Sequence, residues 1–280
     1  MSILHQIRKF TYKPSVVKII QFLRLRKAMR RVYYLFARPK DNKKHISFNG
    51  IDVQFNVNTP LELRLVETPF QKGMGDERNV LQKLLSAIHR DEVIYDVGAS
   101  IGIHTIFMAK KVEQSGQVIA FEPEIQSYNA LQENITLNDL ENVISLNVAF
   151  GSHPHEGFLR SEGGTADFTL TEETSDYNSG LKVNIVQGDD FVREKNLPLP
   201  NIVKIDVEGY EHQVIQGLGE TLKTDICSMV CCEIHPFLLS KGITSDDVVD
   251  LLKSLGFSRI ETQPRGKTFH IFCYKHESKK

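Results

Sequence analysis

The stretch E-V-I-Y-D-V-G-A-S-I-G-I-H, residues 92–104, decides the fold of this chain. Its apolar run from Val93 to Val97 predicts a strand buried on both faces, and Gly98 allows a sharp turn where the strand ends. Apolar residues then recur at helical spacing after Gly102. A strand, a glycine-rich turn and a helix N-terminus form a cradle for a nucleotide-like ligand. The same stretch is also compatible with a purely structural turn in an ordinary α/β domain.

One position in this turn bears on the kind of ligand it would hold. The spacing from Asp96 to Gly102 is D-x-G-x-x-x-G, and Ser100 stands where a G-x-G-x-x-G dinucleotide fingerprint has its second glycine. That glycine lets the backbone approach a pyrophosphate closely. Its absence argues against a dinucleotide such as NAD and favours a nucleoside ligand without phosphates.

The composition is that of a folded protein with one sizeable α/β domain and an appendage. The chain has 280 residues, of which 41% are hydrophobic and 25% charged, a profile that excludes a disordered or membrane-embedded bulk. No uninterrupted apolar stretch reaches the ~18 residues of a spanning helix, and the N-terminal segment has no signal-peptide core. The four cysteines follow no metal-binding spacing. We therefore expect a cytoplasmic protein with reduced cysteines.

The N-terminal segment, residues 1–45, is strongly basic. Up to Lys44 its only acid is Asp41, against 13 lysines and arginines. Residues 15–36 place apolar side chains at three- and four-residue steps, which predicts a basic amphipathic helix. Such a helix could dock on the main domain or on a second copy, lie on an anionic membrane surface, or bind a polyanion. No aromatic-basic platform accompanies it, which disfavours nucleic acid.

Residues 46–90 predict a hairpin and a helix that lead into the core. Apolar residues alternate on both sides of Asn49-Gly50, which is a strong signal for a two-residue hairpin turn. Prolines and glycines between residues 60 and 75 indicate a loop placed where a lid over the ligand site could form. Residues 80–89 indicate a short helix.

The remaining residues, 91–280, alternate strands with helices, which predicts an α/β fold with a mostly parallel, doubly wound sheet. The pattern breaks between residues 151 and 187 into short β-like pieces, which indicates a β-rich insert. Two apolar runs after residue 256 would close the sheet as a C-terminal hairpin. The predicted strands of the sheet are residues 93–97, 117–121, 143–148, 202–207, 228–234, 257–262 and 268–274.

Glu122 follows the second predicted strand of this sheet. Ligands of open α/β sheets bind beyond the carboxyl ends of the strands, and this acid lies 24 residues after Gly98. That interval is close to the ~20 residues at which an acid meets a ribose diol. A carboxylate accepts hydrogen bonds from both ribose hydroxyls, and we favour this role over that of a surface charge at a strand end.

Two further pairs of polar residues end neighbouring strands. Asp206 and Glu208 follow one strand, and Glu233 and His235 end the next; residues two apart share a face. Titratable side chains gathered at strand ends indicate binding or reaction, although solvated strand termini would give the same pattern. His235 is the preferred general base for a hydroxyl, because an imidazole pKa ordinarily lies near ~6.5. Together these side chains could instead hold a divalent cation.

Four motifs, in order along the chain, resemble the FkbM-type family of S-adenosylmethionine-dependent methyltransferases. They are D-V-G-A-S-I-G-I-H-T from Asp96, F-E-P followed by L-x-x-N-x-x-L-N over residues 121–138, V-K-I-D-V-E-G-Y-E over 203–211, and E-I-H over 233–235. The resemblance implies a Rossmann-like class I methyltransferase sheet. It also implies O-methylation of a hydroxyl on a sugar, glycolipid or polyketide-like acceptor.

The resemblance also assigns roles to the residues singled out above. Ser100 replaces the asparagine usual in the D-V-G-A-N form of the motif, and its hydroxyl can still donate and accept. The residues implied to bind the cofactor are Asp96, Gly98, Ser100, Gly102, Glu122 and Asp206, and the candidates for catalysis are His235, Glu233 and Glu208.

We therefore expect a methyltransferase that uses S-adenosylmethionine and a small-molecule, glycan or glycolipid acceptor. The alternative is a non-catalytic nucleoside- or membrane-binding module on the same fold. In that case the basic leader, residues 1–45, would be the part that binds. An NAD-dependent oxidoreductase is disfavoured by Ser100. The sequence leaves open the acceptor, any metal ion and the oligomeric state.

Overall fold

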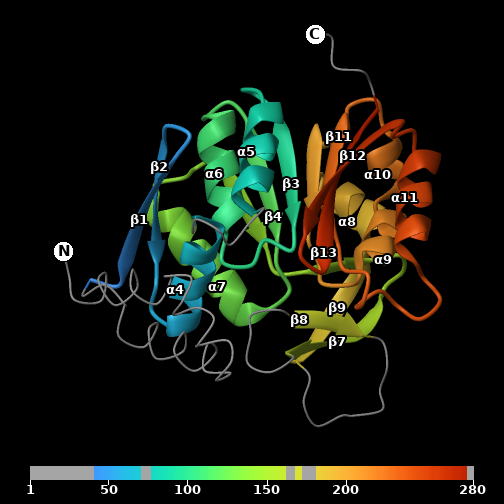
Figure 1. Ribbon diagram of the computed structural model, residues 1–280, viewed down its shortest axis with the longest axis horizontal. Helices are drawn as coiled ribbons and strands as arrows, with labels where there is room; N and C mark the ends of the chain where they lie inside the picture. Colours follow the sequence, from blue (N-terminus) through green and yellow to red (C-terminus); the bar gives the residue numbers. More distant parts are fainter. Residues whose placement is uncertain (1–40, 71–76, 162–167, 172–180, 276–280) are drawn as a thin grey trace, which may run out of the picture.

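A seven-stranded sheet organises the protein. The computed structural model describes residues 41–70, 77–161, 168–171 and 181–275, so the leader helix expected over residues 15–36 lies outside the described residues. The strands lie in the order β12-β13-β11-β10-β3-β4-β5 (Figure 1). Their bounds are β3 Val93–Val97, β4 Gln117–Phe121, β5 Val143–Leu146, β10 Ile202–Ile205, β11 Met229–Ile234, β12 Arg259–Arg265 and β13 Thr268–Tyr274.

The pairing confirms the predicted mostly parallel sheet with its C-terminal hairpin. β5, β4, β3, β10 and β11 pair in parallel, whereas β13 runs antiparallel to both β11 and β12. Helices cover both faces, as expected for a doubly wound sheet (Figure 1). They are α5 Glu77–Ala87, α6 Ile103–Val112, α7 Ile125–Leu137, α8 Gly188–Glu194, α9 Glu211–Gly217, α10 Gly219–Lys223 and α11 Ser245–Ser254.

Successive residues of the central strands are buried on opposite faces of the sheet. Ile94 packs with residues of α5 and α6, while Tyr95 packs with residues of α9, α10 and α11. Cys231 and Cys232 divide between the same two clusters, and both are free thiols. Burial on both faces explains why these strands read as continuous apolar runs rather than as an alternating pattern.

The hairpin predicted around Asn49-Gly50 is confirmed. β1 (Lys43–Phe48) pairs with β2 (Ile51–Asn56) in the register Phe48↔Ile51, which leaves a two-residue turn. Both turn residues have positive φ, 51° for Asn49 and 75° for Gly50. This conformation suits the right-handed twist of the two strands.

Two asparagines, one in α7 and one that caps its C-terminus, hold this hairpin against the core. The side chain of Asn138 accepts a hydrogen bond from the backbone N–H of Gln54 at 2.9 Å, and that of Asn134 accepts one from Asn56 at 2.8 Å. Both belong to the motif L-x-x-N-x-x-L-N. The asparagines of that motif therefore have a structural role in this chain: they pair the edge of β2.

The loop expected over residues 60–75 is instead largely helical. α4 spans Pro60–Glu67 and a 3-10 turn spans Thr68–Phe70, while residues 71–76 lie outside the described residues. The helix begins with a capping box in which Thr59 and Glu62 bond reciprocally, and Pro60 stands at the first turn. T-P-x-E is a known helix-start signal, and the prolines and glycines around it obscured this signal.

Strands between Ala149 and Gln187 form a second, four-stranded sheet. Its order is β6-β9-β7-β8. The strand expected over 143–148 ends at Leu146, because after β5 the chain leaves the main sheet and the next strand, β6, pairs with β9 instead. The bounds are β6 Ala149–Gly151, β7 His155–Ser161, β8 Phe168–Thr171 and β9 Leu181–Gln187.

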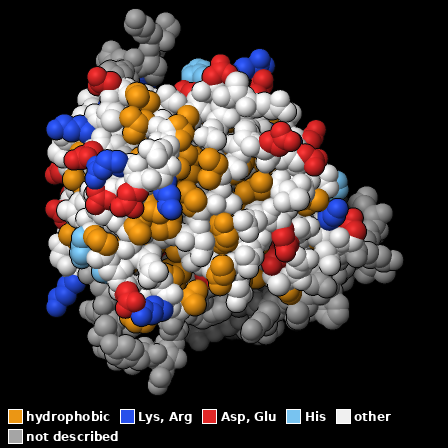
Figure 2. Space-filling model, turned by 180° about the vertical axis from the view of Figure 1, so that it is seen from behind, with side chains coloured by type: hydrophobic (Ala, Val, Ile, Leu, Met, Phe, Trp, Pro, Cys, Tyr) orange, Lys and Arg blue, Asp and Glu red, His pale blue; other side chains and the backbone are white. Residues whose placement is uncertain are grey.

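The described surface mixes apolar and charged side chains. On the face opposite to that of Figure 1, apolar side chains form a broken band between charged groups (Figure 2). Such interspersed apolar area is common on folded proteins. None of the helices among the described residues combines the length and apolar character needed to cross a bilayer.

Candidate active site

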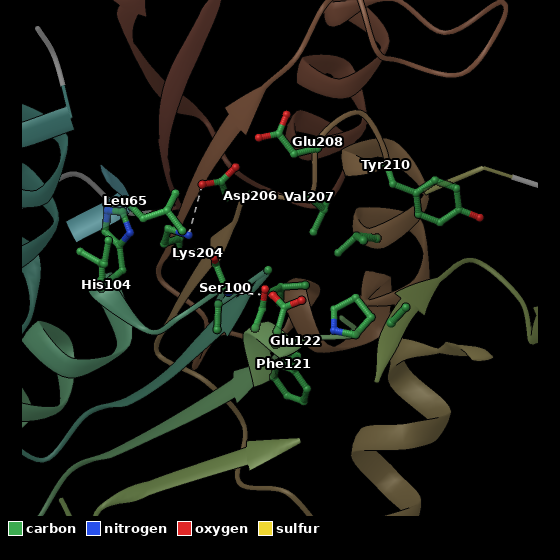
Figure 3. A pocket seen from close by; sticks show the side chains of 18 of the residues that line it. Leu65, Ser100, His104, Phe121, Glu122, Lys204, Asp206, Val207, Glu208 and Tyr210 are labelled. Atoms are coloured by element: carbon green, nitrogen blue, oxygen red, sulfur yellow. Dashed lines mark hydrogen bonds and ion pairs between the residues drawn. The ribbon is translucent and has the colours of Figure 1, made fainter. Parts of the chain in front are cut away.

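A cavity of about 420 Å³ opens at the carboxyl ends of β3, β4 and β10. One wall carries Ser100 and Glu122, and the opposite wall carries Asp206 and Glu208 (Figure 3). These are the strand ends at which the sequence analysis places a ligand. Parallel strands bring such residues together because their carboxyl ends lie at one edge of the sheet.

Gly98 shapes the first wall through its backbone. Its φ is 82°, and a Cβ there would lie 1.9 Å from the carbonyl oxygen of Asp206. The N–H groups of Gly98 and Ala99 both donate to the carbonyl of Phe121, at 2.9 and 3.1 Å. Only glycine fits here, because the turn passes directly over β10 with a positive φ.

Ser100 and Glu122 meet across the ends of β3 and β4. The backbone N–H of Ser100 donates to Glu122 Oε2 at 2.7 Å, and that of Glu124 donates to Oε1 at 2.8 Å. Burial raises the pKa of Glu122 to about 7, although these two hydrogen bonds oppose the rise. Each oxygen keeps a free lone pair, so the carboxylate can still accept from ligand hydroxyls.

Asp96 and Gly102 lie behind this wall and do not line the cavity. Gly102 has a φ of 91° and begins α6. Asp96 is fully buried; it accepts from Thr105 Oγ1 at 2.6 Å and pairs with Lys204 Nζ at 3.2 Å. The structure therefore places Asp96 one layer behind the cavity, where it holds Lys204.

Lys204 forms part of the cavity floor. Its ammonium lies 3.6 Å from Asp206 Oδ2 as well as next to Asp96. Burial opposes the charge of Lys204, but the two aspartates hold its pKa above the ordinary range. The floor thus contains a buried cation with a carboxylate on either side.

His235 is held between two glutamates and does not line the cavity. Its Nδ1 lies 2.7 Å from Glu211 Oε1 and its Nε2 lies 3.1 Å from Glu208 Oε2. Burial opposes its charge, but the hydrogen bond to Glu211 and the charges of Asp206, Glu208 and Glu211 raise the pKa of His235 to about 9. At neutral pH the ring is a cation that cannot accept a proton, which does not fit the expected role of His235 as general base.

Glu233 also lies outside the cavity lining. Arg265 Nη1 bonds both of its carboxylate oxygens, at 2.7 and 2.6 Å, and Thr268 Oγ1 donates to it at 2.6 Å. Burial opposes its charge, but His270, Arg265 and His235 hold the pKa of Glu233 well below the ordinary value. Glu233 therefore stabilises the structure next to the cavity and is not a reacting group.

Two groups of side chains among the described residues have the spacing of a metal site, with ligand atoms within 4.8 Å of one another. In the first, Asp206 and Glu208 join His235, whose two nitrogens both face carboxylates. In the second, which is Glu77, Glu233 and His270, the guanidinium of Arg265 contacts both glutamates. In each group a side chain of the protein already contacts the carboxylates: His235 itself in the first and Arg265 in the second.

Several lining residues were not found from the sequence. α4 contributes Arg64 and Leu65, and the 3-10 turn after it contributes Thr68 and Pro69. Glu77 and Arg265 complete this side of the cavity. The capping box at Thr59 is the signal that would have shown α4. No local motif marks Glu77 or Arg265, since their ion pair at 2.8 Å joins α5 to the distant β12.

Comparison with known proteins identifies the family. The chain matches the Methyltransferase FkbM domain over residues 96–259. This protein belongs to the FkbM methyltransferase family. The match includes the cavity residues from Val97 to Tyr210 and ends within β12.

Two curated relatives are similar to this chain. The hexuronic acid methyltransferase AglP of Haloferax volcanii is 30% identical over 210 residues, covering 75% of this chain and 80% of the relative. The 31-O-demethyl-FK506 methyltransferase FkbM of Streptomyces tacrolimicus is 24% identical over 201 residues, covering 61% of this chain and 75% of the relative. Among solved structures, a SAM-dependent methyltransferase from Aquifex aeolicus covers 78% of this chain and 99% of that chain, with 15% identity and a TM-score of 0.42.

The family match confirms the predicted methyltransferase and its cofactor, and the seven-stranded, mostly parallel sheet confirms the predicted Rossmann-like fold. The FkbM methyltransferase uses S-adenosylmethionine, and the cavity fits this nucleoside: the turn at Gly98 admits no side chain, and the carboxylate of Glu122 faces the cavity with lone pairs to spare. When bound, S-adenosylmethionine supplies an electrophilic methyl group on a sulfonium centre.

Proposed function

We propose that this FkbM methyltransferase methylates a hydroxyl oxygen of a sugar, glycolipid or polyketide-type acceptor. The observation that carries the proposal is the polar wall opposite Glu122. It combines cations and carboxylates from five separate elements, which would hydrogen-bond a polyhydroxylated molecule. Its members are Arg64, Glu77, His104, Lys204, Asp206, Glu208 and Arg265.

The relatives support this class of acceptor. One is named for a hexuronic acid and the other for a demethyl form of FK506, and each of those names denotes an oxygen-rich small molecule. By this proposal the ribose of the cofactor lies at Glu122 and its methionine part lies along Gly98 and Ser100. The acceptor then enters from the side of Arg64 and Glu77.

The test is transfer of label from methyl-labelled S-adenosylmethionine into a cell extract, followed by fractionation. The proposal expects label in the sugar, glycolipid or polyketide fraction, in a form that survives mild alkali as a methyl ether does. Label in protein or nucleic acid would contradict it. Label that is released by alkali would indicate methylation of a carboxylate rather than of a hydroxyl.

The basic leader adds a separate proposal, that residues 15–36 contact an anionic membrane surface. Support comes from their charge and apolar spacing alone, which are typical of interfacial helices. Co-sedimentation of the full chain with vesicles of anionic lipid tests this proposal. Replacing Arg24, Lys27, Arg30 and Arg31 by glutamate should release the protein, and unchanged sedimentation would favour docking within the protein or between copies.

A further inference from the structure

Building on the proposed transfer to a hydroxyl, we propose that Glu208 takes the hydroxyl proton and that His235 and Glu211 hold it in place for this task. Glu208 is then a catalytic residue, because its side chain lines the cavity in which the reacting groups would lie. His235 and Glu211 are positioning residues, because they act through Glu208.

Glu208 has an unusual backbone for its residue type. Its φ is 50°, and Gly209 after it has a φ of 100°. Glutamate gains nothing locally from the left-handed region, which favours glycine or asparagine. Strain of this kind persists where the surrounding structure holds it and is concentrated at functional sites. In this chain it directs a carboxylate into the cavity beside Asp206 (Figure 3).

Glu211 holds both ends of this arrangement. It is fully buried, and its Oε1 accepts from the N–H of Gly209 at 2.9 Å and lies 2.7 Å from His235 Nδ1. One carboxylate oxygen thus ties the strained turn to the imidazole. His235 Nε2 in turn lies 3.1 Å from Glu208 Oε2.

The contacts of His235 favour a proton on both ring nitrogens. Glu211 lies on the Nδ1 side, and Glu208 and Glu233 lie on the Nε2 side, the latter at 3.6 Å. Asp206 adds a fourth negative charge nearby, and these carboxylates favour the imidazolium. An imidazolium donates to Glu208 and cannot itself act as the base.

Other carboxylates of the cavity are engaged elsewhere. Glu77 Oε2 pairs with Arg265 at 2.8 Å, and Asp206 Oδ2 faces Lys204 at 3.6 Å. Glu122 lies on the opposite wall and is bound by two backbone N–H groups. Among these carboxylates, Glu208 is the one that lines the cavity and is held in position by the buried side chains of His235 and Glu211.

The hydroxyl proton that is lost on methyl transfer can be taken by a weak base. The acceptor oxygen gains a bond to the methyl carbon at the expense of the carbon–sulfur bond, whose electron pair remains on sulfur. The hydroxyl proton passes to Glu208, which becomes a neutral carboxylic acid and later returns the proton to solvent. Since an oxygen that carries both a proton and a new methyl group is strongly acidic, a carboxylate is basic enough to receive its proton.

The first test compares rates of label transfer into the cell extract with saturating S-adenosylmethionine. Glu208→Gln should lower the rate about 100-fold or more, while its affinity for S-adenosylhomocysteine by calorimetry stays within about threefold of the wild type. A matched surface variant, Glu220→Gln, should leave both unchanged. The assignment is overturned if Glu208→Gln keeps the wild-type rate, or if it loses cofactor affinity to the same degree as rate.

The second test separates positioning from a merely structural role. The wild-type rate should fall above pH about 9, where His235 loses its proton. In Glu211→Gln this fall in rate should occur at a pH about one to three units lower. In His235→Gln, whose side chain cannot titrate, the fall should be absent. If the rate of Glu211→Gln falls at the same pH as that of the wild type, the positioning role of Glu211 is overturned.

A third measurement needs no acceptor and so separates this inference from the proposed function. Nuclear magnetic resonance of the full chain with isotope-labelled histidine should show both ring nitrogens of His235 protonated at neutral pH, with His235→Gln used to assign the signal. A neutral ring in the wild type would overturn the inference even if transfer to a hydroxyl were established. Conversely, a protonated ring with no label transfer to any sugar, glycolipid or polyketide would contradict the proposed function alone.

Discussion

The two walls of the cavity are built in different ways. At the cofactor wall, a turn of the backbone sets the geometry, through the positive φ values of Gly98 and Ser100 and the single carboxylate of Glu122. At the opposite wall, where we propose that the acceptor binds (the acceptor wall), ion pairs between side chains from α5, β10, β11, β12 and the loop after β10 set it. The first wall depends on what the backbone can adopt, and the second depends on charges that lie far apart in the sequence.

This difference has an energetic counterpart. The backbone turn tolerates almost no added atom, since protein interiors leave little free volume. The network of charges is stable only as a set, because removing one partner leaves another buried without compensation.

The largest effect is expected at the backbone turn. Gly98→Ala should destabilise the protein by about 4 kcal/mol or more and abolish cofactor binding, since its Cβ would meet the Asp206 carbonyl at 1.9 Å. Gly50→Ala is the matched control, with a φ of 75° and no atom within 4 Å of the added Cβ. It should cost only about 1–2 kcal/mol. Thermal unfolding and calorimetry with S-adenosylhomocysteine measure both, and equal losses would show that the contact with the Asp206 carbonyl is unimportant.

The acceptor wall should respond strongly to loss of Glu233. Glu233→Gln should lower the free energy of unfolding by about 3 kcal/mol at neutral pH, because Arg265 and His270 lose their shared counter-charge. Glu261→Gln, which breaks an exposed pair with Lys83, should cost less than about 1 kcal/mol. Denaturant titration of the two variants compares a buried with an exposed ion pair.

The pH dependence of the Glu233 variant follows from its pKa. The folded protein holds this pKa below the ordinary value of 4.5, so the carboxylate stabilises the fold above that pH and loses its contribution as pH falls toward the lowered value. The difference in stability between the wild type and Glu233→Gln should therefore narrow below pH about 4.5. If the difference in stability stays constant across that range, the charge of Glu233 is not its cause, and the changed shape of the side chain is.

A smaller effect is expected for the carboxylate of the cofactor wall. Glu122→Gln should weaken S-adenosylhomocysteine binding by about 1.5–3 kcal/mol, the range for hydrogen bonds to a charged group. Because ribose hydroxyls would donate to the ionised form, wild-type affinity should rise as pH increases through about 7. The variant should show no such rise. A flat wild-type profile would mean that the ribose does not contact this carboxylate.

The smallest effect concerns the position that distinguishes the motif of this chain. Ser100 has a φ of 51°, in a region where asparagine is favoured over serine. Ser100→Asn should therefore stabilise the protein by about 0.5 kcal/mol and leave cofactor affinity nearly unchanged, since the contact to Glu122 comes from the backbone N–H. Thermal unfolding checks the gain. A marked change in affinity would show that the serine hydroxyl itself contacts the ligand.

The sequence by itself determined the parallel sheet, the turn at Gly98 and the place of Glu122. Each of these leaves a local pattern: an apolar run that is buried on both faces, a glycine where φ is positive, or an acid at a strand end. The hairpin at Asn49-Gly50 was predicted for the same reason. The helix α4 also had its signal, the capping box at Thr59, but the neighbouring prolines and glycines gave a competing one.

The tertiary structure alone decided which polar residues face the cavity. Sequence spacing placed Asp96, Glu233 and His235 at the site, whereas the structure shows them one layer behind it, beside Lys204, Arg265 and Glu211 respectively. It also brought Arg64 and Glu77 to the wall. The physical reason is that a strand end determines which edge of the sheet a residue occupies, while the direction of its side chain and its protonation depend on charges supplied by distant elements. His235 changes from expected base to cation because Glu211 and Glu208 meet it only in the folded chain.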